Sequence, residues 1–348
     1  MRLILSGLLG LSLAACAAPD VQPTPADPVS ETPWTFEAAA SDLRAASCPE
    51  GTAFERAQSM PISVEAIDRG TKEQQDAAIS GATFAGAWHL TSDEPNFGGL
   101  SGLDTMRSGS LLAVTDGGAF VWIGIDPETA TPDGIGSIAY MRGADGDLLS
   151  GKREADSEGL VFEDGLALVS FERDHRIEAF DLEGCGASAL AARVADLPAI
   201  IGGKKVPDNK GPEALSLLPD GAMRAGFEFR KSEGSPSGLI MDDGGLGMLE
   251  YAGQSGVYLL TGADQQSDMG VQLFRAYDPV RGNRSLIYVY DADGQRAKIE
   301  LKAPLPVDNF EGVAFGKNGD GATRIWLISD DNFNPDKQRT LLFAFDLN

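Results

Sequence analysis

Short apolar runs separated by polar, glycine-containing turns recur along most of the chain. In each repeat, an apolar run is followed by a turn such as Asp164-Gly165 or Pro219-Asp220-Gly221, and then by a second apolar run that ends in an acidic residue. A third apolar run follows, for example at residues 176–182. This pattern is typical of antiparallel strands joined by tight turns, and it predicts a repeated strand–turn–strand–loop–strand meander.

Four of these repeats begin with related tetrapeptides. They are Gly98-Gly99-Leu100-Ser101, Glu158-Gly159-Leu160-Val161, Glu213-Ala214-Leu215-Ser216 and Glu311-Gly312-Val313-Ala314. The first three start about 55 to 60 residues apart, and the longer last interval fits two units of about 49 residues. A degraded unit is visible inside that interval, at residues 256–262, 271–276 and 286–290. Repeats of about 50 residues with four strands each are the mark of a β-propeller.

The repeats therefore predict an all-β fold, a β-propeller of four-stranded blades. Five blades account for the repeats, and a sixth would exist if residues 60–80 belonged to another blade. Residues 83–90 are expected to supply the outer strand that closes the ring with the C-terminal unit. A parallel α/β fold is disfavoured because no amphipathic helical stretches alternate with the strands.

The N-terminus reads as a targeting signal, not as part of the fold. Arg2 precedes an apolar core, and Leu13-Ala14-Ala15-Cys16 resembles the bacterial lipobox, which implies removal of residues 1–15 and a lipid on Cys16. An ordinary secretory signal with a chance cysteine is the alternative. Because Ala17 stands where an inner-membrane retention signal would have Asp, we expect a lipid anchor in the outer membrane that faces the periplasm. The proline-rich residues 16–35 predict an extended tether, which leaves 36–348 for the propeller.

Two further cysteines, Cys48 and Cys185, would then lie in an oxidising compartment. They can form one disulfide across a loop of about 137 residues, which is worth on the order of 4–5 kcal/mol in the chain-entropy model. Two independent buried thiols are the alternative.

The charge of the chain excludes some partners. Among 348 residues, 52 are acidic and 28 are basic, so the formal net charge is −24. Nucleic acid is excluded as a partner by this excess, because phosphate backbones attract basic surfaces. The same excess argues against adhesion to an anionic membrane surface, so the expected contact with a membrane is through the N-terminal lipid alone.

The propeller prediction gives the acidic residues of the repeats a common location. In a propeller, the innermost strand of a blade begins, and the second strand ends, at the same face of the disc. The acids expected at this mouth of the central channel are Glu158, Glu213, Glu311, Asp116, Glu172, Glu228, Asp330 and Asp331. Clustered carboxylates raise one another's pKa or recruit a cation, and oxygen ligands suit Ca²⁺.

Three roles for these acids stay open: capping backbone amides of a neighbouring blade, holding a metal ion, or acid–base catalysis. A DxDxDG calcium loop is absent from the sequence. The metal hypothesis takes as its Ca²⁺ ligands Glu158, Glu172, Glu213, Glu228, Glu311 and Asp330. No residue is assigned as the catalytic nucleophile.

Basic residues fall in loops at the same face. Those expected to bind an anionic substrate are Arg173, Arg230, Lys231 and Arg339. Guanidinium groups around a carboxylate-held metal suit a phosphate ester. The alternative is that these are the longest loops, and that long loops are charged.

Other chemistry is sparse in the sequence. With only His89 and His175, the chain cannot form a histidine metal cluster. Ser101, in Gly98-Gly99-Leu100-Ser101-Gly102-Leu103, misses the GxSxG pattern and lacks the strand-to-helix context of a nucleophile elbow. These observations argue against a serine hydrolase.

The chain resembles the bacterial phytase-like family, which is described by an esterase-like activity of phytase. The stretches that carry the resemblance are Asn96-Phe97-Gly98-Gly99-Leu100-Ser101-Gly102-Leu103, Asp156-Ser157-Glu158-Gly159-Leu160, Phe171-Glu172-Arg173, Lys210-Gly211-Pro212-Glu213-Ala214-Leu215, Asn309-Phe310-Glu311-Gly312-Val313, Ile328-Ser329-Asp330-Asp331-Asn332-Phe333 and Gln338-Arg339-Thr340-Leu341-Leu342. The resemblance implies a propeller and an activity borrowed from calcium-dependent propeller phytases, which hydrolyse phosphate esters.

Two units depart from the family pattern. The fourth unit has Leu273-Phe274-Arg275-Ala276 where a Leu-x-Glu-Arg ending is expected, so one acid of the ring is lost. The first unit has Gly98 where the other units have Glu. The ring of acids expected from the sequence is therefore incomplete at these two units.

These inferences together predict a periplasm-facing lipoprotein with a phytase-like propeller. The expected activity is Ca²⁺-assisted hydrolysis, or binding, of a small phosphate ester. The alternative is a non-catalytic propeller that binds a glycan, a peptide or an envelope protein, with its acids serving as blade caps. A serine-type esterase ranks third.

Overall fold

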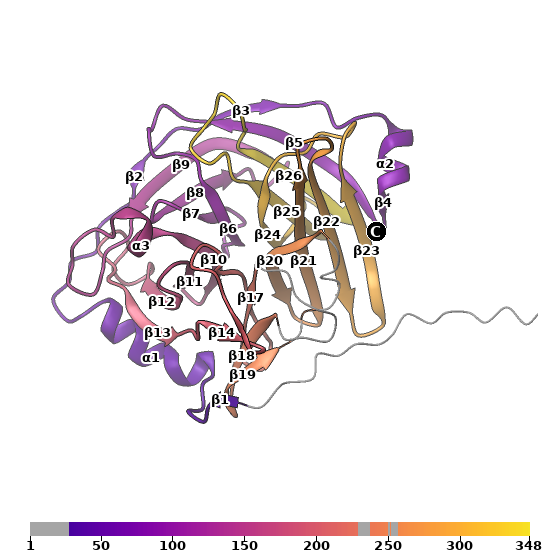
Figure 1. Cartoon of the computed structure of the whole chain (residues 1–348). Coiled ribbons are helices and arrows are strands. Elements are labelled where there is room, and N and C mark those ends of the chain that lie inside the picture. The colour runs from indigo at the N-terminus through magenta and orange to yellow at the C-terminus, as the bar shows by residue number, and fades with distance from the viewer. Residues whose placement is uncertain (1–27, 229–236, 250, 252–256) are drawn as a thin grey trace, which may run out of the picture.

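The computed structural model of the protein describes residues 28–228, 237–249, 251 and 257–348 (Figure 1). The expected signal peptide, the expected lipidation site Cys16 and most of the expected tether lie outside these residues, as do Arg230 and Lys231. Within the described residues, no helix combines the length and the apolar character needed to cross a membrane.

Five antiparallel sheets form the blades of a β-propeller, which confirms the predicted fold class (Figure 1). From the channel outward, blade 1 consists of β6 (Leu100–Thr105), β7 (Leu111–Thr115), β8 (Ala119–Ile125) and β9 (Pro132–Tyr140). Blade 2 consists of β10 (Ser157–Glu163), β11 (Leu166–Phe171), β12 (Arg176–Asp181) and β13 (Ala192–Asp196). Blade 3 consists of β16 (Pro212–Leu217), β17 (Met223–Phe227), β18 (Gly238–Asp242) and β19 (Gly245–Leu249).

Blade 4 consists of β20 (Leu259–Gln266), β21 (Met269–Asp278), β22 (Gly282–Asp291) and β23 (Gly294–Leu301). Blade 5 consists of β24 (Phe310–Lys317), β25 (Thr323–Ser329), β26 (Leu341–Leu347) and β5 (Ala82–Thr91). The pairing of β5 with the C-terminal β26 closes the ring, as predicted for residues 83–90. The inner strands contact one another in turn, and β24 contacts β6.

The hydrophobic core is divided into layers between adjacent blades. One buried cluster lies between each neighbouring pair: for example, Leu168 of blade 2 packs in one cluster with Leu215 of blade 3, and Phe343 of blade 5 packs with Ile287 of blade 4. A central strand is therefore covered on both faces, which explains its continuous apolar runs. Every residue of β11, from Leu166 to Phe171, is buried.

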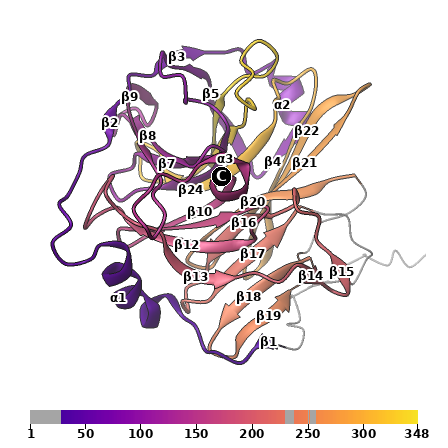
Figure 2. The ribbon, with the colours of Figure 1, turned by 60° about the vertical axis from the view of Figure 1, so that its left-hand side comes forward.

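The segment before residue 82 forms a belt around the propeller instead of a sixth blade (Figure 2). Its strands add one edge strand each to four blades: β1 (Pro28–Ser30) to blade 3, β2 (Gln58–Ser59) to blade 1, β3 (Ser63–Ala66) to blade 5 and β4 (Ile79–Ser80) to blade 4. Helix α1 (Phe36–Ser47) contacts β12 and β13 of blade 2. The belt thus passes the blades in the order opposite to the chain, and it begins inside the segment expected to be a tether.

Helix α1 is joined to blade 3 at its start, where the Phe36 amide donates to the Gly221 carbonyl at 2.9 Å, and to blade 2 at its end. Thr35 caps its start, since the Thr35 side chain accepts a hydrogen bond from the Ala38 amide at 3.3 Å. Directly after its last residue, Cys48 forms a disulfide with Cys185, the two Cα atoms being 5.7 Å apart. The remaining short elements are α2 (Lys72–Ala78), α3 (Gly151–Ala155), β14 (Ile200–Ile201) and β15 (Lys204–Lys205).

Each inner strand contains a β-bulge near its start. In blade 3, Pro212 pairs with Phe227 and Ala214 pairs with Gly226, so Glu213 is the extra residue. A bulge re-aims the side chain that it carries. The register places at this position Ser101, Glu158, Glu213, Thr261 and Glu311 in blades 1 to 5.

This register shows that the alignment of Gly98 with the glutamates of the other repeats is wrong. Gly98 is not the equivalent of Glu158, because the bulge of blade 1 lies three residues later, at Ser101. The sequence repeat is therefore Ser-Gly-Leu in blade 1 and Glu-Gly-Leu in blade 2.

The small residue that follows each bulge is explained by the packing of neighbouring inner strands. A Cβ atom added at Gly102 would lie 2.4 Å from the carbonyl oxygen of Glu158 in the next blade, and one added at Gly262 would lie 2.5 Å from that of Glu311. Glycine permits this close approach of two backbones. The Glu-Gly-apolar repeat thus combines a re-aimed carboxylate with a contact that closes the ring.

Candidate functional site

Two rings of equivalent side chains lie at one end of the channel, which we call the acidic mouth. The first ring is formed by the bulged residues Ser101, Glu158, Glu213, Thr261 and Glu311. Directly before each bulge, an inner-strand residue pairs with a residue of the second strand. The second ring is formed by the residue that follows that partner in each blade: Asp116, Glu172, Glu228, Arg275 and Asp330. In blades 1, 2, 3 and 5, the amide of the second-ring residue donates to a carbonyl at the start of the inner strand, with N–O distances of 2.8, 2.9, 3.2 and 2.9 Å.

All six carboxylates predicted as metal ligands belong to these two rings and are buried. Burial, and then the charge of Glu311, raise the pKa of Glu158 well above its ordinary value. Burial, and then the charge of Glu158, do the same for Glu213. Burial also raises the pKa of Asp330, on which the charge of Glu311 acts in the same direction. The mouth therefore concentrates negative charge that protons or a cation must offset.

Arg275 does more than remove one acid from the second ring. Its Nη2 lies 2.8 Å from Glu228 Oε1, and its Nη1 bonds both Glu311 and Asn309. Burial acts to lower the pKa of Arg275, but the charges of Glu311 and Glu228 outweigh it and hold that pKa above its ordinary value. Glu228 and Glu311, predicted as calcium ligands, thus have a guanidinium as their partner.

A carboxylate trio lies on blade 2, on the other side of the mouth. Asp156, Glu158 and Glu172 each offer an oxygen, and these oxygens all lie within 4.8 Å of one another. The sequence prediction included two of the three and missed Asp156, which precedes the inner strand by one residue. Its presence in the stretch Asp156-Ser157-Glu158 was the available signal, but an acid just before a strand has no periodicity to distinguish it.

Two cations hold Asp156 from outside the trio. Lys152 Nζ lies 2.9 Å from one oxygen of Asp156 and 2.5 Å from Asp116 Oδ2, and Arg173 Nε lies 2.6 Å from the other oxygen of Asp156. The side chains of Lys152 and Arg173 are 55% and 37% exposed, so both cations lie at the rim.

Further polar atoms near the trio lack partners within the described residues. Asp116 Oδ1 and Ser101 Oγ are buried, and neither atom forms a hydrogen bond with the described residues. Ser101 itself is only 3% exposed. An oxygen-only set of buried carboxylates, with unsatisfied oxygens beside it, fits the ligand preference of Ca²⁺.

The predicted anion-binding residues have different surroundings. The backbone of Arg173 has a φ of 60°, a value that residues other than glycine rarely adopt. Within the described residues, its Nε bonds Asp156 and its terminal nitrogens form no hydrogen bond. Arg339 lies at the rim, with its Nε 3.7 Å from Asp308 Oδ2. Lys210, which was not predicted to bind substrate, forms an ion pair with Glu228. Arg230 and Lys231 are outside the described residues.

Some acids of the mouth serve as caps between blades. Glu172 Oε1 accepts a hydrogen bond from the Gly211 amide of blade 3 at 2.8 Å. Asp331, at the end of blade 5, accepts one from the Gly99 amide of blade 1 at 2.9 Å and another from Thr340 Oγ1 at 3.1 Å. Capping, one of the three roles considered from the sequence, is thus present at Asp331 and at Glu172, and Glu172 also belongs to the carboxylate trio.

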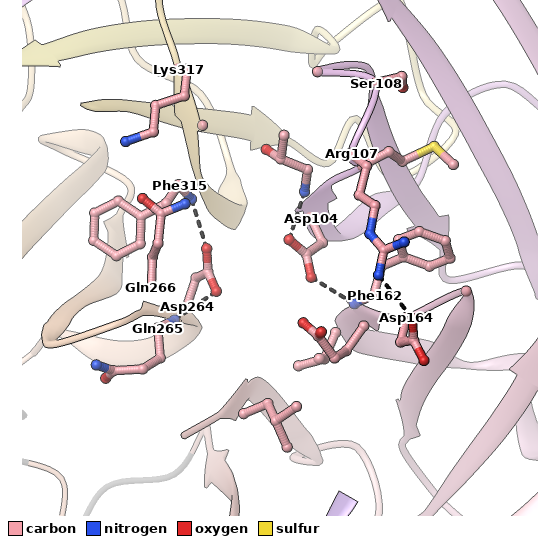
Figure 3. Close-up of a pocket in the computed structure, with 18 of the residues that line it drawn as sticks. Asp104, Arg107, Ser108, Phe162, Asp164, Asp264, Gln265, Gln266, Phe315 and Lys317 are labelled. Atoms are coloured by element: carbon pink, nitrogen blue, oxygen red, sulfur yellow. Dashed lines mark hydrogen bonds and ion pairs between the residues drawn. The ribbon is translucent and has the colours of Figure 1, made fainter. Parts of the chain in front are cut away.

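The opposite end of the channel opens into a cavity of about 1170 Å³ that is lined by residues of all five blades (Figure 3). Asp104 and Asp264 lie on opposite sides of this cavity. Asp104 accepts a hydrogen bond from the Phe162 amide of blade 2 at 2.6 Å, and Asp264 accepts one from the Phe315 amide of blade 5 at 2.7 Å. Burial and the charge of Asp264 raise the pKa of Asp104 well above its ordinary value, and burial raises the pKa of Asp264 to about 6.

The sequence prediction missed these two aspartates. Each follows the bulged residue of its strand by three positions, but only blades 1 and 4 have an acid there. Between the two ends, the channel narrows to a space of about 10 Å³ that is lined in part by Leu103, Leu160 and Leu215. That space is about enough for one water molecule.

Comparison with protein families gives one match. A family model described as "Phytase-like: Esterase-like activity of phytase" matches residues 95–333. That range contains both rings of the acidic mouth. No curated protein sequence matches the chain.

Solved structures with a similar arrangement include a protein of unknown function from Dyadobacter fermentans, with 10% identity and a TM-score of 0.39, covering 85% of this chain and 97% of that one. Another is the catalytic domain of a GH62 α-L-arabinofuranosidase from Coprinopsis cinerea, with 13% identity, a TM-score of 0.45 and coverages of 77% and 96%. A third is an endo-arabinase from Bacteroides thetaiotaomicron, with 10% identity, a TM-score of 0.36 and coverages of 86% and 98%. Likenesses this distant carry no information about substrate.

Proposed function

The chain belongs to the Phytase-like family, and on that premise we propose that it is a divalent-cation-dependent hydrolase of small phosphate esters, with Ca²⁺ as the cation. The observation that carries the proposal is the trio of buried carboxylates at the acidic mouth, Asp156, Glu158 and Glu172, whose oxygens lie within 4.8 Å of one another.

The charge around the trio supports a divalent cation. Together with Asp116, the trio provides four carboxylates, and the cations bonded to them are Lys152 and Arg173. If all four carboxylates are ionised, the formal charge of this group is −2, which one divalent cation would neutralise. Burial raises the pKa of Glu158 and of Glu172, and the negative charge of Asp156 acts on both in the same direction.

The residues of the trio and its rim would divide the work between them. Glu158 and Glu172 would hold the cation together with Asp156, whose orientation is fixed by Lys152 and Arg173. The terminal nitrogens of Arg173 would orient the phosphoryl group, since a guanidinium matches two phosphate oxygens. A bound divalent cation would supply Lewis acidity and offset the negative charge of the transferring phosphoryl group.

A second candidate function is a non-catalytic propeller in which these acids only join blades. The hydrogen bond from the Gly211 amide to Glu172 favours it, because that bond needs no ligand. The two candidates differ in what the acids do when they are replaced by amides.

The test is hydrolysis of a panel of phosphate esters by wild-type protein, Glu158→Gln and the control Glu163→Gln. Glu163 lies at the far end of the same strand and is exposed. The proposal expects Ca²⁺-dependent turnover that is lost by more than tenfold in Glu158→Gln and kept in Glu163→Gln. In the absence of Ca²⁺, the melting temperature of Glu158→Gln should equal or exceed that of wild type, because the amide removes repulsion among buried carboxylates. Absence of turnover with every ester, or turnover that survives in Glu158→Gln, contradicts the proposal.

A further inference from the structure

Arg275 is the one member of the second ring that carries the opposite charge. The register of blade 4, in which Leu260 pairs with Phe274 and Gly262 with Leu273, gives Arg275 the place that Glu228 has in blade 3. Its guanidinium bonds Glu228 on one side and Glu311 on the other, so one side chain joins blades 3, 4 and 5.

We propose that Arg275 is a tethered substitute for a second bound cation, and that it limits the acidic mouth to a single divalent cation, at Asp156, Glu158 and Glu172. The inference deepens the proposed function and rests on it for the occupied half of the mouth. The substituted half is argued from the contacts of Arg275 alone.

The two halves of the mouth differ in where their cations lie. Around the trio, Lys152 and Arg173 bond from the rim, and their side chains are 55% and 37% exposed. In the other half, Lys210 pairs with Glu228 through a side chain that is 33% exposed, but Arg275 is only 19% exposed and lies between the carboxylates of Glu228 and Glu311. A guanidinium and a divalent cation cannot both occupy that position.

The atoms bonded by Arg275 are of the same kind as the atoms that bind Ca²⁺ in proteins. Glu228 Oε1, Glu311 Oε1 and Asn309 Oδ1 are the oxygens bonded by Arg275, and carboxylate and amide oxygens are the ligands that Ca²⁺ takes in proteins. A side chain with neutral charge at position 275 would leave these three oxygens facing one another without a positive partner between them. Repulsion would then favour recruitment of a cation.

The experiment is a calorimetric titration of metal-stripped protein with CaCl₂, which measures the number of sites in wild type and in Arg275→Gln. The matched control is Arg284→Gln, which removes another buried arginine from the same blade, one that pairs with Asp278. The proposal expects one site in wild type and in the control, and a second site in Arg275→Gln. Arg275→Lys, which keeps a positive charge, should again show one site.

The outcomes separate this inference from the proposed function. No site in wild type and one in Arg275→Gln would refute the proposed function, and with it the cation at the trio, but it would uphold Arg275 as the substitute for a bound cation. One site in both proteins would refute the inference and leave the proposed function standing. No site in either protein refutes both.

Folding of the variant is checked by far-ultraviolet circular dichroism with and without 5 mM CaCl₂. A variant that folds only with Ca²⁺ supports the inference, because the ion then replaces the stabilising charge of Arg275. A variant that remains unfolded at this Ca²⁺ concentration overturns it, because a cation would then be unable to take the place of the guanidinium.

Discussion

Arg275 and Glu228 occupy equivalent positions in adjacent blades and are bonded to each other, with Arg275 Nη2 2.8 Å from Glu228 Oε1. This repeated position holds a carboxylate in blades 1, 2, 3 and 5, and it holds a positively charged guanidinium in blade 4. The fivefold scaffold is therefore used asymmetrically: the blade 2 side of the mouth presents carboxylates with cations only at the rim, and the blade 4 side is neutralised from within.

The cavity at the opposite end of the channel should make stability depend on pH. Asp264 has a folded-state pKa of about 6, above the value of 3.8 taken for an unperturbed aspartate, so between these values the folded state binds more protons than the unfolded state. The free energy of unfolding contributed by Asp264 must therefore fall as the pH rises from about 4 to about 6, and stay low above that. The measurement is urea unfolding of wild type and Asp264→Asn at several pH values.

The comparison with Asp264→Asn isolates this residue from other buried acids whose pKa is raised. We expect the decline in stability between pH 4 and 6 to be smaller in the variant than in wild type. Asp268→Asn, an exposed acid in the same hairpin, is the control and should follow wild type. Equal slopes for Asp264→Asn and wild type would contradict the assignment.

The glycine that follows the bulge of blade 1 should tolerate no larger side chain without cost. In Gly102→Ala, the new methyl group would lie 2.4 Å from the Glu158 carbonyl oxygen and 2.8 Å from Val114 Cγ2, so the inner strands of blades 1 and 2 must separate. Overpacking of this kind costs about 1–3 kcal/mol of the free energy of unfolding. Chemical denaturation measures it, and Gly270→Ala, where the nearest atom is the flexible end of Gln265, should change stability by less than about 0.5 kcal/mol.

Arg173 should act on substrate affinity more than on the fold. Its Nε is bonded to Asp156, while its terminal nitrogens are free of hydrogen bonds to the described residues, so Arg173→Lys keeps the charge and loses the bidentate geometry. We expect KM for a phosphate ester to rise at least fivefold in Arg173→Lys, with the melting temperature within about 2 °C of wild type. Arg281→Lys, at an exposed arginine of blade 4, should leave KM unchanged. An unchanged KM in Arg173→Lys would remove this residue from the binding site.

The blade architecture could be predicted from the sequence because its signal is repeated. A bulged residue followed by a small residue recurs in every blade, because the inner strands approach one another closely there, as at Gly159. The bulged residue is a glutamate in blades 2, 3 and 5. Ser101 was missed as the equivalent residue because Gly-Leu occurs twice in this stretch, at Gly99-Leu100 and at Gly102-Leu103, and the repeat was aligned on the first of them.

The belt and the role of Arg275 could not be predicted for different reasons. The edge strands β1 to β4 are two to four residues long, too short for a hydrophobic period to show. At Arg275, the sequence showed that an acid was missing from a ring. That the guanidinium bonds Glu228 and Glu311 depends on how blades 3 and 5 approach blade 4, which only the folded chain specifies.

The most direct test of the proposed cation-dependent site is the thermal unfolding of EGTA-treated protein with and without Ca²⁺, for wild type and Glu158→Gln. A ligand present at a hundred times its Kd stabilises the native state by about 2.7 kcal/mol, which shifts the melting temperature measurably. We predict a rise of the wild-type melting temperature that saturates with Ca²⁺ and is absent in Glu158→Gln. A wild-type protein that melts at the same temperature with and without millimolar Ca²⁺ would contradict it.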